Sequence, residues 1–95
     1  MLDTSKLTHI CDIAERALDV HAHEQKRKSA YLTLVDAYQA WKVEHKIGRV
    51  ERNSPEWKQM QADTEDEYAR FCVARDHEYN ARRRLDTAIR RYHAA

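Results

Sequence analysis

Glycine and proline each occur once in this chain of 95 residues, as Gly48 and Pro55, and only seven positions separate them. Both residues interrupt regular secondary structure, glycine through its conformational freedom and proline through its missing N–H. The sequences on either side lack both residues and follow a helical spacing. The chain therefore has one place where it is expected to turn.

The residues beside this break carry the signals that end one helix and begin another. Lys42 and Lys46 precede Gly48, and a glycine in that place can adopt the left-handed conformation that terminates a helix. Pro55 restricts Ser54 to an extended conformation, which suits a residue that caps the start of a helix. The pattern predicts a turn between two helices.

The expected fold is all-α, a long antiparallel helical hairpin that forms a single domain over residues 1–95. Its expected elements are a helix over residues 4–47, a turn over 48–54 and a helix over 55–93. Residues 21–29 are almost wholly polar. A kink or short loop there, which would give three helices, is the alternative to a continuous first helix.

Apolar residues recur at intervals of three and four along both expected helices, which is the spacing of one helical face. In the first helix, the expected face comprises Leu7, Ile10, Cys11, Ala14, Ala17, Leu18 and His21, then Tyr31, Leu34, Val35, Tyr38, Trp41 and His45. In the second helix, it comprises Trp57, Met60, Thr64, Tyr68, Phe71, Ala74 or Arg75, Glu78, Ala81, Leu85, Ala88 or Ile89, and Tyr92. Residues that oppose each other in this hairpin have numbers that add to about 102.

The two cysteines, Cys11 and Cys72, are expected to be buried and free. In the hairpin register they lie roughly 30 Å apart along the bundle, because a helix rises about 1.5 Å per residue. This separation is far beyond the reach of a disulfide bond within one hairpin.

A single hairpin buries only one face of each helix, and so short a chain buries little apolar surface alone. Val20, Leu32 and Val43 lie off the main stripes and broaden the apolar surface. We therefore expect a homodimer, in which two hairpins form an antiparallel four-helix bundle.

Composition and motifs argue against several functional classes. The formal net charge is +1, and the chain has neither a membrane-spanning apolar run nor a signal-peptide pattern, so we expect a cytoplasmic protein. The single glycine is incompatible with a phosphate-binding loop, and the common helical and cysteine metal motifs do not occur. We expect no enzyme activity, no cofactor and no metal site.

Charged residues occupy stripe positions at the middle of the hairpin. Glu24 and Lys28 would oppose Arg75, Glu78 and Arg82, and charges in such places need partners. One interpretation is a mutually paired layer that fixes the register, as polar seam residues do in coiled coils. The other is a pocket for an anionic ligand, with Lys28, Arg75 and Arg82 as donors.

The strongest charge pattern is an arginine run near the end of the sequence. Residues 82–91 contain five arginines against Asp86, a local charge of +4. A basic helical face is one footprint of nucleic-acid binding. The opposed residues 1–24 carry a charge of −3, however, and can neutralise part of it.

The leading hypothesis is a small non-enzymatic interaction protein that binds and modulates a macromolecular partner, expected to be a protein. Adaptors and inhibitors of phage or mobile-element type are similarly short, helical and charge-patterned, and they lack a pocket. The expected contact residues are Arg83, Arg84, Arg90 and Arg91 on a basic face, Asp63, Glu65 and Asp66 on an acidic face, and Trp57. The alternative is a module that binds nucleic acid or an anionic ligand through the arginine-rich second helix.

Overall fold

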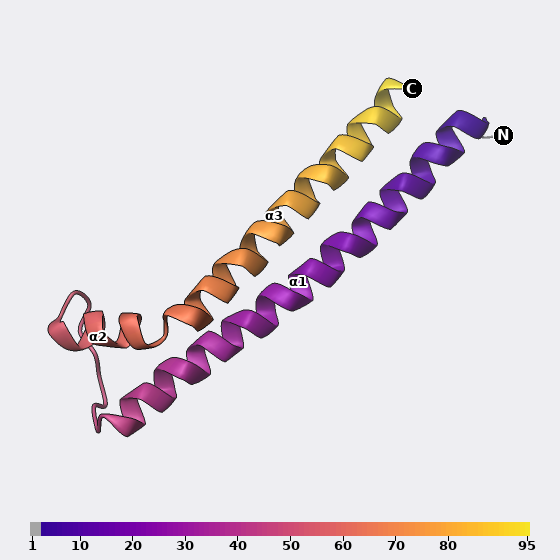
Figure 1. Ribbon diagram of the computed structural model, residues 1–95. Coiled ribbons are helices and arrows are strands. Elements are labelled where there is room, and N and C mark those ends of the chain that lie inside the picture. Colours follow the sequence, from indigo (N-terminus) through magenta and orange to yellow (C-terminus); the bar gives the residue numbers. More distant parts are fainter. Residues whose placement is uncertain (1–2) are drawn as a thin grey trace.

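The computed structural model describes residues 3–95, so residues 1 and 2 of the expected domain lie outside the described part. Its helices are α1 (Thr4–Glu44), α2 (Pro55–Asp63) and α3 (Glu65–Ala94), which confirms the all-α class. α1 and α3 lie side by side and run antiparallel, and α2 lies where the chain turns (Figure 1). The described residues form a rod with extents of 66 × 19 × 18 Å.

α1 is one continuous helix of 41 residues, so the alternative with a break at residues 21–29 is wrong. Its start is capped by Asp3, whose Oδ1 accepts a hydrogen bond of 3.0 Å from the N–H of Lys6. The polar middle stays helical because Glu, Gln, Lys, Arg and Ala, which favour helices, dominate it. Along residues 3–95, no helix has the apolar run that a bilayer crossing needs.

The end of α1 differs from the expectation in the residue that terminates it. The helix ends at Glu44 rather than at residue 47, and Lys46, not Gly48, takes the left-handed conformation, with φ 56°. The N–H of Ile47 donates to the carbonyl of Lys42 at 2.9 Å, which is the long hydrogen bond of a Schellman motif. The expected kind of cap is present, but it forms two residues before the glycine.

The expected second helix, over residues 55–93, is divided at Thr64. Ser54 caps α2 as predicted and accepts a hydrogen bond of 3.1 Å from the N–H of Trp57. Thr64 is buried, and its hydroxyl donates to the carbonyl of Met60 at 2.7 Å, a bond that bends helices. α2 and α3 consequently point in different directions (Figure 1).

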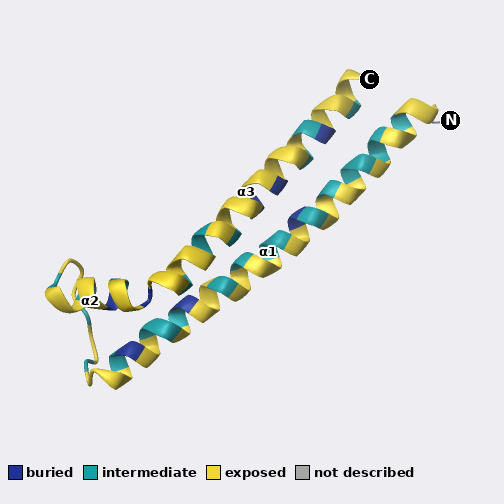
Figure 2. Cartoon of the chain, viewed as in Figure 1, coloured by how far each residue is buried: buried dark blue, intermediate teal, exposed yellow. Residues whose placement is uncertain are grey.

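α1 and α3 meet along a seam with seven-residue periodicity, the spacing that keeps one row of each helix facing the other. On α1 the row consists of Lys6, Ile13, Val20, Arg27, Leu34 and Trp41, all buried or half-buried. On α3 it consists of Glu67, Phe71, Ala74, Glu78, Ala81, Leu85, Ala88 and Tyr92, which are also buried or half-buried and confirm the expected stripe from Phe71 onwards. The buried residues are few and are spread along the rod (Figure 2).

The expected stripe at the start of α1 is wrong, because it lies outside the seam. Leu7 and Leu18 are 51% and 71% exposed, and Cys11 is exposed between them. Val20, which the pattern placed off the stripe, is only 7% exposed. Both cysteines are free, but Cys11 is not buried as expected, and Cys72 is half-buried.

The turn end of the hairpin is held by Trp41, which is 5% exposed. Its Nε1 donates to Oδ2 of Asp63 at 2.8 Å, and its ring stacks on that of His45 with centroids 4.0 Å apart. Hydrogen bonds from Trp41 and Gln59 hold the pKa of the Asp63 carboxyl below its ordinary value. The hydrogen bond from Trp41 to Asp63 therefore joins the last turns of α1 to the end of α2.

A candidate macromolecular interface

Four arginines line a groove between α1 and α3 at the end of the hairpin that lies away from the turn. The groove has a volume of about 420 Å³ and is lined by Asp12, Arg16, Asn80, Arg83, Arg84, Thr87 and Arg91. We call this set the arginine groove. With four arginines and one aspartate, its lining carries a formal charge of +3.

Two of these arginines are neutralised within the chain. Arg84 lies 3.3 Å from Oδ2 of Asp19 on α1, and Arg16 lies 3.4 Å from Oδ1 of Asp12, one turn earlier on the same helix. Exposed pairs of this kind contribute little to stability. Both guanidinium groups lie along the groove.

The other two arginines have no such partner. Within residues 3–95, no carboxylate lies within 4.0 Å of Arg83 or Arg91. Arg83 instead lies over the ring of Tyr79, 5.9 Å from its centroid. Two guanidinium groups, each with donors in a planar fork, therefore remain available for an acidic ligand.

The predicted basic face is only partly gathered in this groove. Arg83, Arg84 and Arg91 line it, whereas Arg90 pairs with Asp86 at 3.2 Å and does not line it. Sequence reasoning missed Arg16, which comes from the opposite helix. The hairpin register contained the signal, because a residue at 16 lies opposite the region of 86 when opposed numbers add to about 102.

The predicted acidic face and Trp57 lie at the other end of the hairpin. Asp63 accepts hydrogen bonds from Trp41 and Gln59, so its carboxylate is engaged in structure. Glu65 and Asp66 are exposed in the first turn of α3, where negative charge stabilises a helix start. Trp57 is half-buried on α2.

Ion pairs cross the middle of the hairpin, in the layer where pairing was predicted. Arg27, which the pattern did not single out, donates from Nε to both oxygens of Glu78 at 2.8 and 3.2 Å. Arg82 lies 3.6 Å from Glu78 and 3.7 Å from Glu24. Lys28 pairs with Glu24 at 3.0 Å, and the hydrogen bond and charge of Lys28, followed by the charge of Arg82, lower the pKa of Glu24.

The three residues predicted as anion donors are therefore each beside a carboxylate. Lys28 and Arg82 share Glu24, and Arg75 lies 3.5 Å from Asp76 on the surface of α3. Arg75 is not brought into the layer that the other two form. The ion pairs that join α1 to α3 in this layer are Arg27 with Glu78 and Glu24 with Arg82.

Histidines also meet across the helices. The rings of His23 and His77 pack edge to face with centroids 5.7 Å apart, and Nε2 of His23 lies 3.5 Å from Oδ1 of Asp19. In the described part of the chain, no three His, Cys, Asp or Glu side chains come together as metal ligands would.

Comparisons with protein-family models, with curated proteins and with solved structures give no match for this chain.

Proposed function

We propose that this chain is a small non-enzymatic interaction protein that binds and modulates an acidic protein partner through the arginine groove, as an adaptor or inhibitor. The observation that carries the proposal is the convergence of Arg16, Arg83, Arg84 and Arg91 on one groove, with Arg83 and Arg91 free of carboxylates within residues 3–95. Arginine is a frequent anchor of protein interfaces.

Reversing the charge of the two free arginines is expected to abolish partner capture. Arg83→Glu combined with Arg91→Glu changes the formal charge of the groove by −4, and we expect at least about a tenfold loss of affinity. The measurement is affinity capture from cells of the source organism with the wild-type chain and the variant as baits.

Arg90→Glu is the matched control, because Arg90 lies between Arg83 and Arg91 in the sequence of α3 but does not line the groove. It should retain the partner that the double variant loses. Capture that is equally strong with all three baits would refute the arginine groove as the binding surface.

Nucleic acid is the second candidate, favoured by the same free guanidinium groups. It predicts binding that weakens steeply as salt rises, with Arg90 contributing about as much as its neighbours. An electrophoretic shift assay at low and physiological salt separates it from the leading proposal.

We also propose that two copies of the chain associate through the outer strip of α1, which we define as Leu7, Cys11, Ala14, Leu18 and Leu32. All five residues are exposed in the single chain, and Leu32 alone is 61% exposed. Their spacing places them on one face of the helix. This face lies away from α3, so a dimer formed there leaves the arginine groove open.

Leu18→Lys combined with Leu32→Lys is expected to convert the dimer into a monomer of 11.3 kDa. Each lysine would place a charge in an apolar contact, which association cannot tolerate without a partner charge. Size-exclusion chromatography with light scattering measures the mass. Tyr79→Lys on α3, at a residue that is 62% exposed, is the control and should remain dimeric. A wild-type monomer at micromolar concentration would refute the dimer.

A further inference from the structure

A second groove lies beside the arginine groove, and its character is different. It has a volume of about 320 Å³ and a floor made by Ala69, Val73 and Ala74 of α3. Lys26 of α1 and Arg70 of α3 stand at its rim. Val73 is 54% exposed, so the floor is open to solvent in the single chain. We call it the apolar groove.

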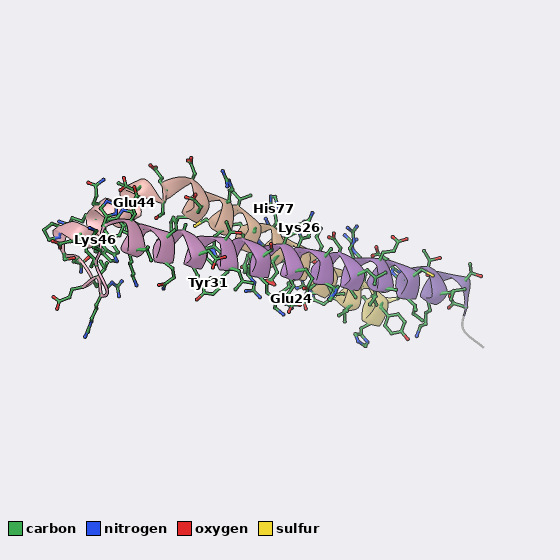
Figure 3. All side chains as sticks on the ribbon, turned by 90° about the horizontal axis from the view of Figure 1, so that it is seen from below. Glu24, Lys26, Tyr31, Glu44, Lys46 and His77 are labelled. Carbon is green, nitrogen blue, oxygen red and sulfur yellow. The ribbon has the colours of Figure 1, made fainter. Side chains whose placement is uncertain are left out.

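The two grooves belong to one surface, because one row of α3 lines both. This row consists of Arg70, Val73, His77, Asn80, Arg84, Thr87 and Arg91, which follow one another at intervals of three and four. Lys26 and His77 project from one side of the hairpin, whereas Glu24 and Tyr31 project from the other (Figure 3). The row spans about 30 Å, the length of a helix of about 20 residues.

The charges along this surface select its ligand. Like Arg83 and Arg91, the rim residues Lys26 and Arg70 have no carboxylate within 4.0 Å among residues 3–95. Among residues 3–95, no acidic side chain lines the apolar groove. A ligand that follows the whole row therefore meets an apolar floor and unneutralised cations at both ends.

The floor favours a protein helix over a single-stranded nucleic acid. Single-stranded nucleic acids bind through bases that stack on aromatic rings, and the floor presents alanine and valine instead. The two histidine rings at its edge pack against each other, edge to face. An amphipathic helix, in contrast, places an apolar face in such a groove and its flanking charges on the rims.

We propose that the apolar groove and the arginine groove together bind one acidic amphipathic helix of the protein partner, which lies along α1 and α3 as a third helix. The inference rests on the proposed function and specifies the chemistry of its partner. The apolar face of that helix covers Val73 and Ala74, and its acidic flanks meet Lys26, Arg70 and the free arginines.

The test uses a fluorescent synthetic peptide of about 20 residues, with leucines at the spacing of one helical face and glutamates on both flanks. A peptide of the same composition, with the leucines spread around the helix, is the ligand control. Fluorescence anisotropy with the full chain measures affinity. We expect the amphipathic peptide to bind at least about tenfold more tightly than the scrambled one.

Val73→Asp is expected to weaken binding of the amphipathic peptide at least about tenfold, because it places a carboxylate on the apolar floor. Val43→Asp makes the same change on α1 outside both grooves and should leave affinity within about twofold. Arg70→Glu should weaken binding, whereas Arg75→Glu, on a residue outside both grooves, should not. Circular dichroism of each variant shows that the helices persist.

Equal binding of the two peptides, or equal affinity of Val73→Asp and wild type, would overturn the inference. Tighter binding of an oligothymidine strand than of the amphipathic peptide would also overturn it, in favour of nucleic acid. A cellular partner that is lost with the Arg83 and Arg91 reversals but kept with Val73→Asp would leave the proposed function standing while this inference fails.

Discussion

Trp41→Ala is expected to lower the free energy of unfolding by about 3 to 5 kcal/mol, a large part of the stability of a chain this size. The change removes a side chain that is 5% exposed, its hydrogen bond to Asp63 and its stacking on His45. Because the hydrogen bond to Asp63 joins α1 to the end of α2, its loss should weaken the attachment of α2. Urea denaturation followed by circular dichroism, at one chain concentration, measures the change.

Trp57→Ala is the matched control, since the other tryptophan is half-buried and its side chain donates none of the hydrogen bonds found in residues 3–95. Its loss should stay below about 1.5 kcal/mol. Equal destabilisation by the two substitutions would show that Trp41 does not anchor this end.

Trp41→Phe separates the hydrogen bond from the packing, and at neutral pH it should lower the free energy of unfolding by less than Trp41→Ala does. Because this bond lowers the pKa of Asp63, its contribution is present above about pH 4 and is lost as the pH falls through the lowered pKa. The stability difference from wild type should therefore shrink in acid. A difference that does not change with pH would assign it to packing alone.

Glu78→Ala is expected to destabilise the hairpin by about 2 to 3 kcal/mol, because it leaves the charge of Arg27 at the seam without its partner. Glu78 is 8% exposed, and the side chain of Arg27 is 30% exposed, so water can relieve only part of the loss. Thermal and urea unfolding of the variant measure it.

The double variant Arg27→Leu with Glu78→Leu should recover stability to within about 1 kcal/mol of wild type, since paired apolar side chains replace a buried ion pair well. Asp86→Ala is the surface control, because Asp86 and Arg90 form an exposed pair on α3, and it should cost less than about 1 kcal/mol. A double variant as unstable as Glu78→Ala would show that the ion pair itself stabilises the seam.

Local chemistry made the starts of α1 and α2 predictable. Asp3 and Ser54 cap their helices through side-chain hydrogen bonds, and Pro55 follows Ser54 as the sequence indicated. These interactions reach only three residues along the chain, so neighbouring sequence determines them. The residue that takes the left-handed conformation at the end of α1 is not the glycine. Lys46 adopts it, two residues before Gly48.

The seam of α1 could not be predicted from apolar residues alone. Lys6 and Arg27 lie in the same seam row as Val20, at multiples of seven residues from it. Because both are charged, a search for apolar residues does not reveal that row. Long charged side chains pack their aliphatic stems against a neighbour while the charges stay in water or pair. The row that contains Leu7 and Leu18 is more apolar, yet it lies outside the seam.

The break at Thr64 and the arginine groove show two further limits. Nothing in the sequence around Thr64 forbids a helix. Its hydroxyl bond to Met60 is local, but its burial depends on how the neighbouring elements pack. Arg83 and Arg91 were predictable as a basic face of one helix. Arg16 joins them only because α1 crosses that face, a fact of register rather than of local pattern.

The two ends of the rod also differ in the contacts that hold the helices together. At one end, the turn joins α1 to α2, and Trp41 of α1 donates a hydrogen bond to Asp63 of α2. At the opposite end, where the described chain begins and ends (Figure 1), Lys6 of α1 lies 5.6 Å from the ring centroid of Tyr92 on α3. Because helix termini open more readily than a covalently closed turn, local unfolding is expected to begin at the end that carries Lys6 and Tyr92. The arginine groove lies in that half of the hairpin. A partner bound there should therefore oppose the local unfolding of this end.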